Sequence, residues 1–264
     1  MSLQSLLNAR VSILVVCLYV ISPSLGAEEV RWPNGGQMAI SLMYDDSLNS
    51  QLDNAVPVLR QHGITASFYL TLTAPTVMTR IDEWRALAKQ GYELGNHTVF
   101  HSCSASLPNR DWVDPNNNLD NYNIAKITQE LKLANSFLHA LDGQKERTFS
   151  PPCGDRHVAK GQFYWPEIAD MFVAVKGLEG SDKSFVNIWE PSDVSAKALI
   201  DRVELEAAKG TQLFTLVIHG VGGDYLSLSS EAHAALVAYL AKNRDRFYVD
   251  SYINIMRRHN SMSE

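Results

Sequence analysis

Five side chains of the types that bind metal ions or transfer protons come just after segments that are typical of buried β-strands. They are Asp45, Asp46, His97, His101 and His219. In an α/β barrel the C-terminal ends of the parallel strands meet at one face, and the loops on that face carry the active site. We therefore expect these five side chains to lie close together, where they could hold a metal ion and transfer protons.

A metal site is the first function that this set of residues suggests. His97 and His101 are four residues apart, so a helical turn would place both imidazoles on one side of the segment. Two imidazoles and one carboxylate leave open positions on a divalent ion, and open positions suit catalysis. Taken alone, the spacing is also compatible with two polar loop histidines that bind nothing.

The adjacent acidic residues and the late histidine suggest acid–base chemistry. Neighbouring side chains at a strand end point to opposite sides, so either Asp45 or Asp46 could bind the metal while the other remains free as a base. His219 carries an imidazole, a side chain that often acts in general acid–base catalysis, and it could act as a general acid. The alternatives are a simple turn at residues 45–47 and a strand-end histidine without chemistry.

Short β-type runs alternate with helical stretches along the chain. Strands are expected at residues 37–44, 65–72, 92–95, 147–150, 171–175, 185–189, 213–218 and 247–249. Helices are expected at residues 52–61, 82–90, 124–141, 195–208 and 231–242. This alternation predicts an α/β fold with a parallel sheet, either a barrel or a doubly wound sheet. The irregular stretch at 102–123 is long for a connection, and such loops are often functional.

Composition is that of an ordinary globular protein. Of the 264 residues, 45% are hydrophobic and 20% are charged, and the formal net charge is -6. A chain of this length can bury one large core. It has no basic block and no stripe of interleaved basic and aromatic residues, so we do not expect it to bind nucleic acid.

The first 27 residues are typical of a secretory signal peptide. Arg10 precedes an apolar run at 11–21, and small residues lead from there to Ala27. The run is shorter than the roughly 20 residues of a membrane span, so no stable span is expected after cleavage; an uncleaved anchor is the alternative. We expect an exported protein, periplasmic or secreted, with a signal peptide at 1–27 and one domain at 28–264.

Cleavage of that segment would leave two cysteines in the mature chain. Cys17 lies within the signal, and Cys103 and Cys153 remain. Paired cysteines in an oxidising compartment commonly form a disulfide bond. The sequence therefore predicts a bond between Cys103 and Cys153, the alternative being two separate thiols that pack as small apolar groups.

Three segments together resemble the motifs of the polysaccharide deacetylase family, which is also called the NodB-homology family or carbohydrate esterase family four. Residues 43–47, Met-Tyr-Asp-Asp-Ser, look like its first motif, Thr-Phe-Asp-Asp-Gly. Residues 97–101 match its second motif, His-Ser/Thr-x-x-His/Ser, and residues 217–219 match its last, Leu-x-His. The resemblance covers residues 37–249 and has the motifs in the family's order.

This resemblance implies a fold, a reaction and a set of roles. The fold would be a single-domain, distorted (β/α) barrel, and the reaction would be metal-dependent removal of N-acetyl or O-acetyl groups from a carbohydrate. The family's motifs assign the metal to three residues, namely Asp46, His97 and His101. They make Asp45 the general base and His219 the general acid. One divalent ion is implied, with Zn²⁺ expected and Ni²⁺ or Co²⁺ as alternatives.

Two positions depart from the family's pattern. The third motif, Arg-x-Pro-aromatic, aligns with residues 150–153, so Ser150 stands in place of the arginine and Cys153 in place of the aromatic residue. The fourth motif supplies an aspartate and a tryptophan; Trp189 fits the tryptophan, but no aspartate is evident near it. In the family that arginine and aspartate orient the base, and Arg156 is a candidate substitute.

Substrate contacts are expected from the same motifs and from aromatic residues. The motifs suggest Tyr44, Pro152 and Trp189 as contacts with an acetylated carbohydrate. Candidates for stacking on sugar rings are Trp112, Tyr122, Trp165, Trp189 and Tyr225. Two other functions remain open at this point: a catalytically degenerate carbohydrate-binding protein on the same barrel, and a metallohydrolase that acts on a non-sugar amide.

Overall fold

The computed structural model describes residues 32–178 and 186–262. The predicted signal peptide at 1–27 lies outside the described residues, as does the first residue of the strand predicted at 185–189. The rest of the predicted strands and helices can be compared with the structure element by element.

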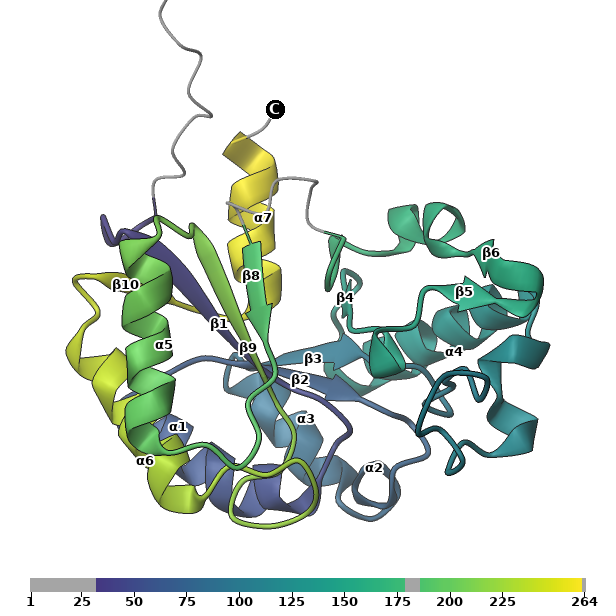
Figure 1. Cartoon of the computed structure of the whole chain (residues 1–264), viewed down its shortest axis with the longest axis horizontal. Helices are drawn as coiled ribbons and strands as arrows, with labels where there is room; N and C mark the ends of the chain where they lie inside the picture. Colours follow the sequence, from purple (N-terminus) through teal and green to yellow (C-terminus); the bar gives the residue numbers. More distant parts are fainter. Residues whose placement is uncertain (1–31, 179–185, 263–264) are drawn as a thin grey trace, which may run out of the picture.

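A parallel sheet forms the centre of the fold (Figure 1). Its strands run in the order β7-β4-β3-β2-β1-β9-β8, and β10 pairs with the first half of β1. The strands are β1 (Met38–Tyr44), β2 (Ser67–Leu70), β3 (Glu93–Asn96), β4 (Thr148–Phe149), β7 (Ala174–Val175), β8 (Val186–Trp189), β9 (Leu213–Ile218) and β10 (Phe247–Val249). All of its pairings are parallel, and the sheet curls between its edge strands β7 and β8. This is the distorted (β/α) barrel that the resemblance implies.

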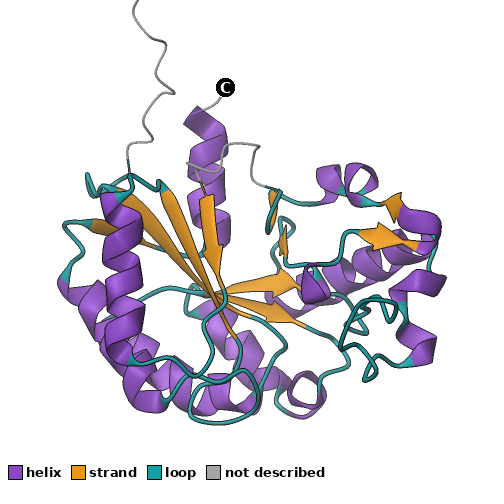
Figure 2. Cartoon of the chain, in the orientation of Figure 1, coloured by secondary structure: helices purple, strands orange, loops and turns teal. Residues whose placement is uncertain are grey.

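Helices pack against this sheet (Figure 2). They are α1 (Val56–His62), α2 (Pro75–Thr79), α3 (Ile81–Lys89), α4 (Ile124–Asp142), α5 (Ala196–Ala208), α6 (Ser230–Lys242) and α7 (Tyr252–Met262). A small antiparallel hairpin, β5 (His157–Val158) and β6 (Gln162–Phe163), lies next to α4, and Val158 shares an apolar cluster with Ile127 and Leu131 of that helix. Within the described ranges, no helix combines the length and the apolar character that crossing a membrane requires.

The central strand β1 is buried along its whole length because it has apolar neighbours on both faces. Ile40, Leu42 and Tyr44 belong to the large core cluster that includes apolar residues of the outer helices. Ala39 and Met43 point the other way and belong to a second cluster that contains Ile255 of α7. The sequence of a strand that is covered on both faces is a nearly continuous apolar run. This is why β1 and β9 can be recognised in the sequence.

The elements that the sequence analysis did not predict are short or only partly apolar. Helix α7 buries Tyr252, Ile253, Ile255 and Met256 in its first half, while its second half is polar. Its apolar pattern therefore spans little more than one helical turn, too short for periodicity to identify. Helix α2 has five residues and the strands of the β5–β6 hairpin have two each, so they leave no pattern either.

A buried histidine beneath the sheet makes the stability of the fold depend on pH. His233 of α6 is fully buried, and its Nε2 lies 2.6 Å from the hydroxyl of Tyr44. Burial lowers the pKa of His233 to about 4. As the pH falls from about 6.5 to about 4, the unfolded chain takes up a proton that the folded chain does not. The free energy of unfolding should therefore fall by up to about 3 kcal/mol over that window and stay constant above it.

Urea unfolding at pH 7.0 and pH 4.5 measures this effect, with His233→Gln as the matched variant. Glutamine keeps a hydrogen-bonding group beside Tyr44 but does not titrate. The wild type should lose more stability than the variant between the two pH values. Equal losses would mean that His233 does not carry the pH dependence.

Candidate active site

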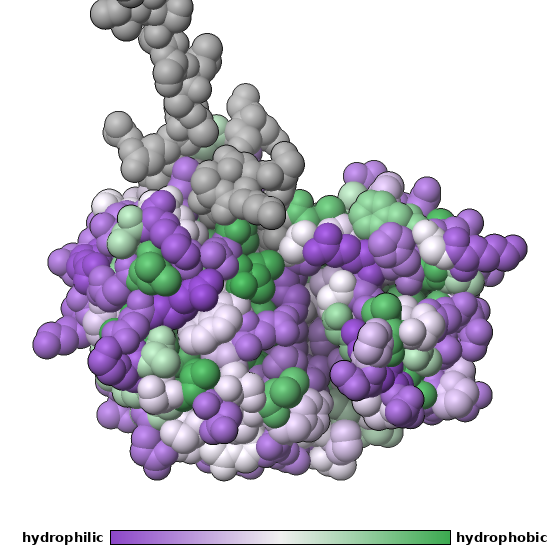
Figure 3. Space-filling model, in the orientation of Figure 1, coloured by the Kyte–Doolittle hydropathy of each residue, from purple (hydrophilic) through white to green (hydrophobic). Residues whose placement is uncertain are grey.

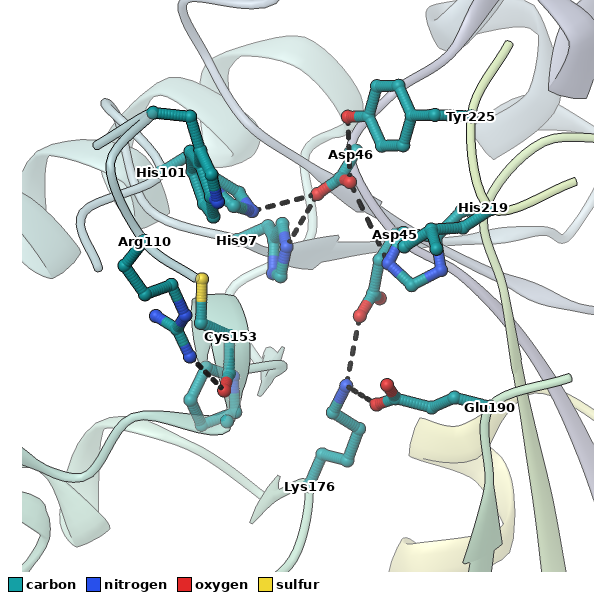
Figure 4. A pocket seen from close by; sticks show the side chains of 14 residues that line it. Asp45, Asp46, His97, His101, Arg110, Cys153, Lys176, Glu190, His219 and Tyr225 are labelled. Atoms are coloured by element: carbon teal, nitrogen blue, oxygen red, sulfur yellow. Dashed lines mark hydrogen bonds and ion pairs between the residues drawn. The ribbon is translucent and has the colours of Figure 1, made fainter. Parts of the chain in front are cut away.

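A pocket of about 570 Å³ opens at the C-terminal ends of the strands. Its lining consists of Asp45, Asp46, His97, His101, Arg110, Trp112, Pro151, Cys153, Gly154, Lys176, Glu190, His219, Tyr225 and Leu226. All five residues singled out from the sequence are among them, and Figure 4 shows them facing one another. The face drawn in Figure 3 is hollowed between the part of the molecule that carries α5 and α6 and the part that carries β5 and β6.

Three potential ligand atoms converge in this pocket. Oδ1 of Asp46 lies 3.0 Å from Nε2 of His97 and 3.0 Å from Nε2 of His101. On the far side of its ring, Nδ1 of His97 lies 2.6 Å from the carbonyl oxygen of Ser150. A proton on Nδ1 satisfies that carbonyl and leaves the Nε2 lone pair aimed at Asp46. Two acceptor atoms that face each other in this way require either a proton or a cation between them.

The donor set fits a divalent ion. In a tetrahedral site with bonds of 2.0–2.1 Å, ligand atoms lie about 3.3 Å apart, close to the 3.0 Å separations seen here. The carbonyl behind His97 provides the kind of outer support that fixes a ligating imidazole. A second group, His101 with Cys103 and Cys153, also gathers possible ligand atoms. Its two cysteines are joined in a disulfide, however, so neither offers a thiolate.

The charges of the site favour a cation between these groups. Asp46 is buried, which opposes its ionisation, but hydrogen bonds from His101 and His97 hold its pKa well below the usual value. Burial likewise opposes the charged form of His97, but Asp45 and Asp46 outweigh it and raise the pKa of His97 above 6.5. The two carboxylates thus attract positive charge to the imidazoles, and a divalent ion can supply that charge in place of protons.

The loop that carries the two histidines is shaped by hydrogen bonds from β3 and α4. The side chain of Asn96 accepts a hydrogen bond from the Thr98 amide, and the carboxylate of Glu130 accepts one from each of the Val99 and Phe100 amides. The segment does not make the helical turn that would place both imidazoles on one side, because Thr98 and His101 adopt positive φ angles of 66° and 55°. The histidines nevertheless converge on one point. A left-handed backbone conformation costs free energy in residues other than glycine, and such residues cluster at functional sites.

Asp45 is held by two donors on one of its oxygens. Its Oδ2 accepts a hydrogen bond from Oγ of Ser150 at 2.8 Å and another from Nζ of Lys176 at 2.9 Å. Its Oδ1 is buried and has no hydrogen-bond partner among the described residues. Burial alone would raise the pKa of Asp45, but the charges of Lys176 and His97 outweigh it and lower that pKa below its ordinary value. Asp45 is therefore a carboxylate with one oxygen free.

His219 and Tyr225 complete the pocket on the side of Asp46. Nε2 of His219 lies 3.7 Å from Oδ2 of Asp46, and the hydroxyl of Tyr225 donates a hydrogen bond to the same oxygen at 2.9 Å. The loop between them turns tightly at Gly220, where a Cβ would lie 2.1 Å from the carbonyl oxygen of Gly223. The glycine-rich sequence after β9 therefore brings Tyr225 back over Asp46, one of the candidate metal ligands.

The predicted disulfide is present in the structure. Cys103 and Cys153 are bonded, with a sequence separation of 50 and Cα atoms 6.0 Å apart. Nδ1 of His101 lies 3.7 Å from Sγ of Cys103. The bond ties the loop after His101 to the segment after β4, and both of these segments line the pocket.

The substrate contacts predicted from the motifs are corrected by the structure. Tyr44 is fully buried in the core, stacked on Phe68, because strand alternation turns it away from the face that Asp45 occupies. Pro152 is buried and its neighbour Pro151 lines the pocket instead. Trp189 packs against the large core cluster rather than the pocket. Of the aromatic residues suggested for sugar stacking, Trp112 and Tyr225 line the pocket; Tyr122 and Trp165 are buried elsewhere.

Three charged pocket residues were missed by the sequence analysis. Lys176 and Glu190 directly follow β7 and β8, so the rule that identified Asp45 and His219 could have identified them too. Arg110 lies within the long irregular loop, where no strand end indicates it; its guanidinium pairs with Asp155 at 3.0 Å. Arg156, the candidate substitute for the missing arginine, instead stacks over the ring of Trp165 at 4.5 Å.

Comparison with solved structures identifies the same fold in other proteins. The peptidoglycan deacetylase PdaC of Bacillus subtilis is 17% identical to this chain, over 86% of this chain and 95% of that one, with a TM-score of 0.54. A pseudoenzyme of the CE4 family from Bacillus anthracis is also 17% identical, over 84% of this chain and 66% of that one, with a TM-score of 0.55. At these identities the likeness concerns the fold.

Curated proteins give a more partial match. A gellan lyase of a Bacillus species is 23% identical over 194 residues, which cover 72% of this chain and 7% of the relative. The chain spans less than a third of the length of the curated relatives it matches.

The family-level comparison bears on the pocket itself. Residues 33–162 match the family model described as polysaccharide deacetylase. This range contains the pocket residues Asp45, Asp46, His97 and His101. The sheet around them has the fold of the family's deacetylases. The motifs, the curled parallel sheet and the matching family model agree, and the chain belongs to the polysaccharide deacetylase family.

Proposed function

We propose that this protein is a metal-dependent hydrolase that removes acetyl groups from a carbohydrate. The observation that carries the proposal is the pairing of two aspartates with different surroundings in one pocket. Asp46 faces the two imidazoles, whereas Asp45 faces Lys176 and keeps one oxygen free. This arrangement supplies a ligand set and a separate base within a single site, and metal-assisted hydrolysis requires both.

The roles of the chain's own residues follow from this geometry. Asp46, His97 and His101 would hold one divalent ion, for which zinc is the expected choice and nickel or cobalt are alternatives. When bound, such an ion polarises a carbonyl group and makes a water molecule more acidic. Asp45 accepts a proton from the attacking water at Oδ1. His219 donates a proton to the amine or alcohol that leaves, and Tyr225 keeps Asp46 oriented through its hydrogen bond.

The carbohydrate part of the proposal rests on family membership and on the pocket rim. Trp112 and Tyr225 line the pocket and remain more than half exposed. Flat aromatic faces with an apolar body and a polar edge suit the faces of sugar rings. An acetylated carbohydrate that enters between them would bring its acetyl group toward Asp45 and Asp46 at the base of the pocket.

Activity is favoured over a purely binding role on the same barrel. The fold occurs in a protein described as a pseudoenzyme, so fold alone does not establish catalysis. In this chain, however, all five candidate side chains are present and line one pocket. We also propose export of the protein, because its first 27 residues are typical of a signal peptide and its disulfide suits an oxidising compartment.

A substrate panel tests the proposal and separates its variants. Acetate release should be measured with N-acetylated glucosamine oligosaccharides, peptidoglycan glycan strands, O-acetylated xylo-oligosaccharides and N-acetylated amino acids. Release from at least one carbohydrate, at a rate well above that from the amino acids, is the expected result. Release from the amino acids alone would favour a hydrolase of non-sugar amides.

His219→Ala should lower kcat, and the size of the loss should depend on the leaving group. General acid catalysis contributes about 10²–10⁴-fold when the leaving group needs a proton, and much less when it departs readily as an anion. The variant should therefore lose far more activity on an acetylated sugar than on an activated aryl acetate. His139→Ala, an exposed histidine on α4, serves as the control. Equal losses on both substrates would show that His219 does not donate the proton.

A further inference from the structure

An ion pair at the pocket joins the residues that follow the two edge strands of the sheet. Lys176 directly follows β7 and Glu190 directly follows β8, and their side chains approach to 3.5 Å. Figure 4 shows the Lys176 ammonium between the Glu190 carboxylate and Asp45. A chain of three charges thus runs from the pocket rim to the candidate base, and it joins the two ends of the curled sheet.

Of the two ion pairs, the one between Lys176 and Asp45 is the more deeply buried, and its charges are therefore less screened by solvent. The side chains of Lys176 and Asp45 are 7% and 3% exposed, whereas that of Glu190 is 57% exposed. A lysine is almost never buried unless its charge is paired. Burial alone would lower the pKa of Lys176, but Asp45 and Glu190 outweigh it and raise that pKa, so the ammonium is retained. Removal of one partner from such a buried pair leaves the other charge uncompensated.

The donors around Asp45 hold one of its oxygens and leave the other without a hydrogen-bond partner among the residues that the structure describes. The ammonium of Lys176 and the hydroxyl of Ser150 both donate to Oδ2, and Oδ1 has no partner in the described part of the chain. A guanidinium typically binds a carboxylate through both oxygens at once. An ammonium is a point donor and can be confined to one oxygen. Lysine and serine together therefore fix the position of Oδ2 and leave the lone pairs of Oδ1 without a donor among the described residues.

Other cations of the pocket region do not reach this carboxylate. Arg110 lines the pocket, but its guanidinium pairs with Asp155. Arg156 lies over Trp165. Among the described lysines and arginines, Lys176 is the one for which an ion pair with Asp45 is observed. The arginine that the family's third motif would supply is replaced here by Ser150, which donates to the same oxygen as Lys176.

We propose that Lys176 is a positioning residue that orients Asp45 so that Oδ1 faces the attacking water. Glu190, which follows the opposite edge strand β8, holds Lys176 in place through their ion pair. This inference rests on the proposed hydrolase function and extends it to a lysine–glutamate pair that takes over the orientation of the base. Lys176 acts through Asp45, and the hydrogen bonds and ion pairs recorded for its ammonium are with Asp45 and Glu190, not with the proposed metal ligands.

A double-variant cycle between Lys176 and Asp45 tests this role. Lys176→Met should lower kcat by about 10- to 100-fold, the usual cost of losing a partner that orients a site residue, while KM and metal content change little. Lys176→Arg keeps the positive charge but can donate to both carboxylate oxygens, so it should recover only a small part of that loss. In the Asp45→Asn background, Lys176→Met should cause no further loss, because a residue that acts through Asp45 has nothing left to orient.

Matched controls separate positioning from a general structural effect. Lys197→Met removes an ion pair of an 83% exposed lysine on α5, which does not line the pocket, and should leave kcat unchanged. Lys176→Ala with added methylammonium should regain activity, because the small cation can donate to Asp45 from the space left by the side chain. Tetramethylammonium carries charge without an N–H donor and should not restore activity. Glu190→Gln should give a smaller loss than Lys176→Met.

The outcomes separate this inference from the function it rests on. A wild-type protein loaded with zinc that releases no acetate from any substrate overturns the proposed function and this inference together. An active wild type with Lys176→Met within about twofold of it overturns the inference alone. The same holds if Lys176→Met costs an equal factor in the wild-type and Asp45→Asn backgrounds, since additive losses indicate independent roles. If Lys176→Met fails to fold, absence of rescue of Lys176→Ala by methylammonium overturns the inference.

Discussion

Replacement of Asp45 by asparagine should lower kcat by about 10²–10⁴-fold, the range that a positioned general base contributes. Asparagine has nearly the same shape as aspartate. In the wild type, Ser150 and Lys176 donate hydrogen bonds to Oδ2 of Asp45, and the carbonyl oxygen of asparagine can still accept them. It cannot take a proton from water. The loss should therefore appear in kcat, with a small change in KM, and the metal should stay bound because Asp46, not Asp45, faces the imidazoles.

The control for this prediction is an aspartate of another kind. Asp53 is an exposed carboxylate that pairs with Arg80, so Asp53→Asn removes a surface ion pair and should leave kcat unchanged. Metal content of both variants should be measured beside their activity. An Asp45→Asn enzyme within a few-fold of the wild type would exclude the base role, and one that had lost its metal would place Asp45 among the ligands.

Removal of the three proposed metal ligands should lower activity by an equally large factor, because the protein would no longer bind the metal ion. The wild type should contain about one divalent ion per chain, and the triple variant Asp46→Ala, His97→Ala, His101→Ala should contain none and have no activity above background. Each single histidine variant should bind the ion more weakly, because one of three protein ligands is gone. Elemental analysis after dialysis gives the metal content, and acetate release gives the activity.

A histidine outside the pocket provides the comparison for the ligand variants. His157 is exposed in the β5–β6 hairpin, and His157→Ala should keep both metal and activity. Near-UV circular dichroism shows whether the triple variant remains folded. A folded triple variant that retained the wild-type metal content would place the metal elsewhere in the protein.

Much of the site could be predicted because its residues follow strands that are easy to identify. The strand β9 is fully buried and almost entirely apolar, so the histidine after it is conspicuous in the sequence. The loop after β3 differs, since its histidines converge through left-handed residues rather than through a helical turn. Those residues depend on hydrogen bonds from Glu130 of α4, and such long-range contacts leave no local signal in the sequence.

The contact between Lys176 and Glu190 could not be predicted, because it depends on how the edge strands come together in space. Lys176 and Glu190 follow short or weakly apolar strands at opposite edges of the sheet, and only the curl of the sheet brings their side chains together. Tyr44 shows the opposite error, because its place in the first motif suggested a substrate contact. Alternation along β1 turns its side chain into the core, where its hydroxyl lies beside His233. The direction of a side chain follows from the strand, not from the motif.

The most direct test of the account is acetate release from an acetylated oligosaccharide by one preparation in three states: as isolated, after removal of metal with a chelator, and after addition of one equivalent of zinc. The account predicts release in the first state, loss of at least most of it in the second and recovery in the third. An Asp45→Asn sample carried through the same steps should bind zinc and remain nearly inactive. Release of acetate that is unchanged by the chelator, from a protein shown to be free of metal, would contradict the account.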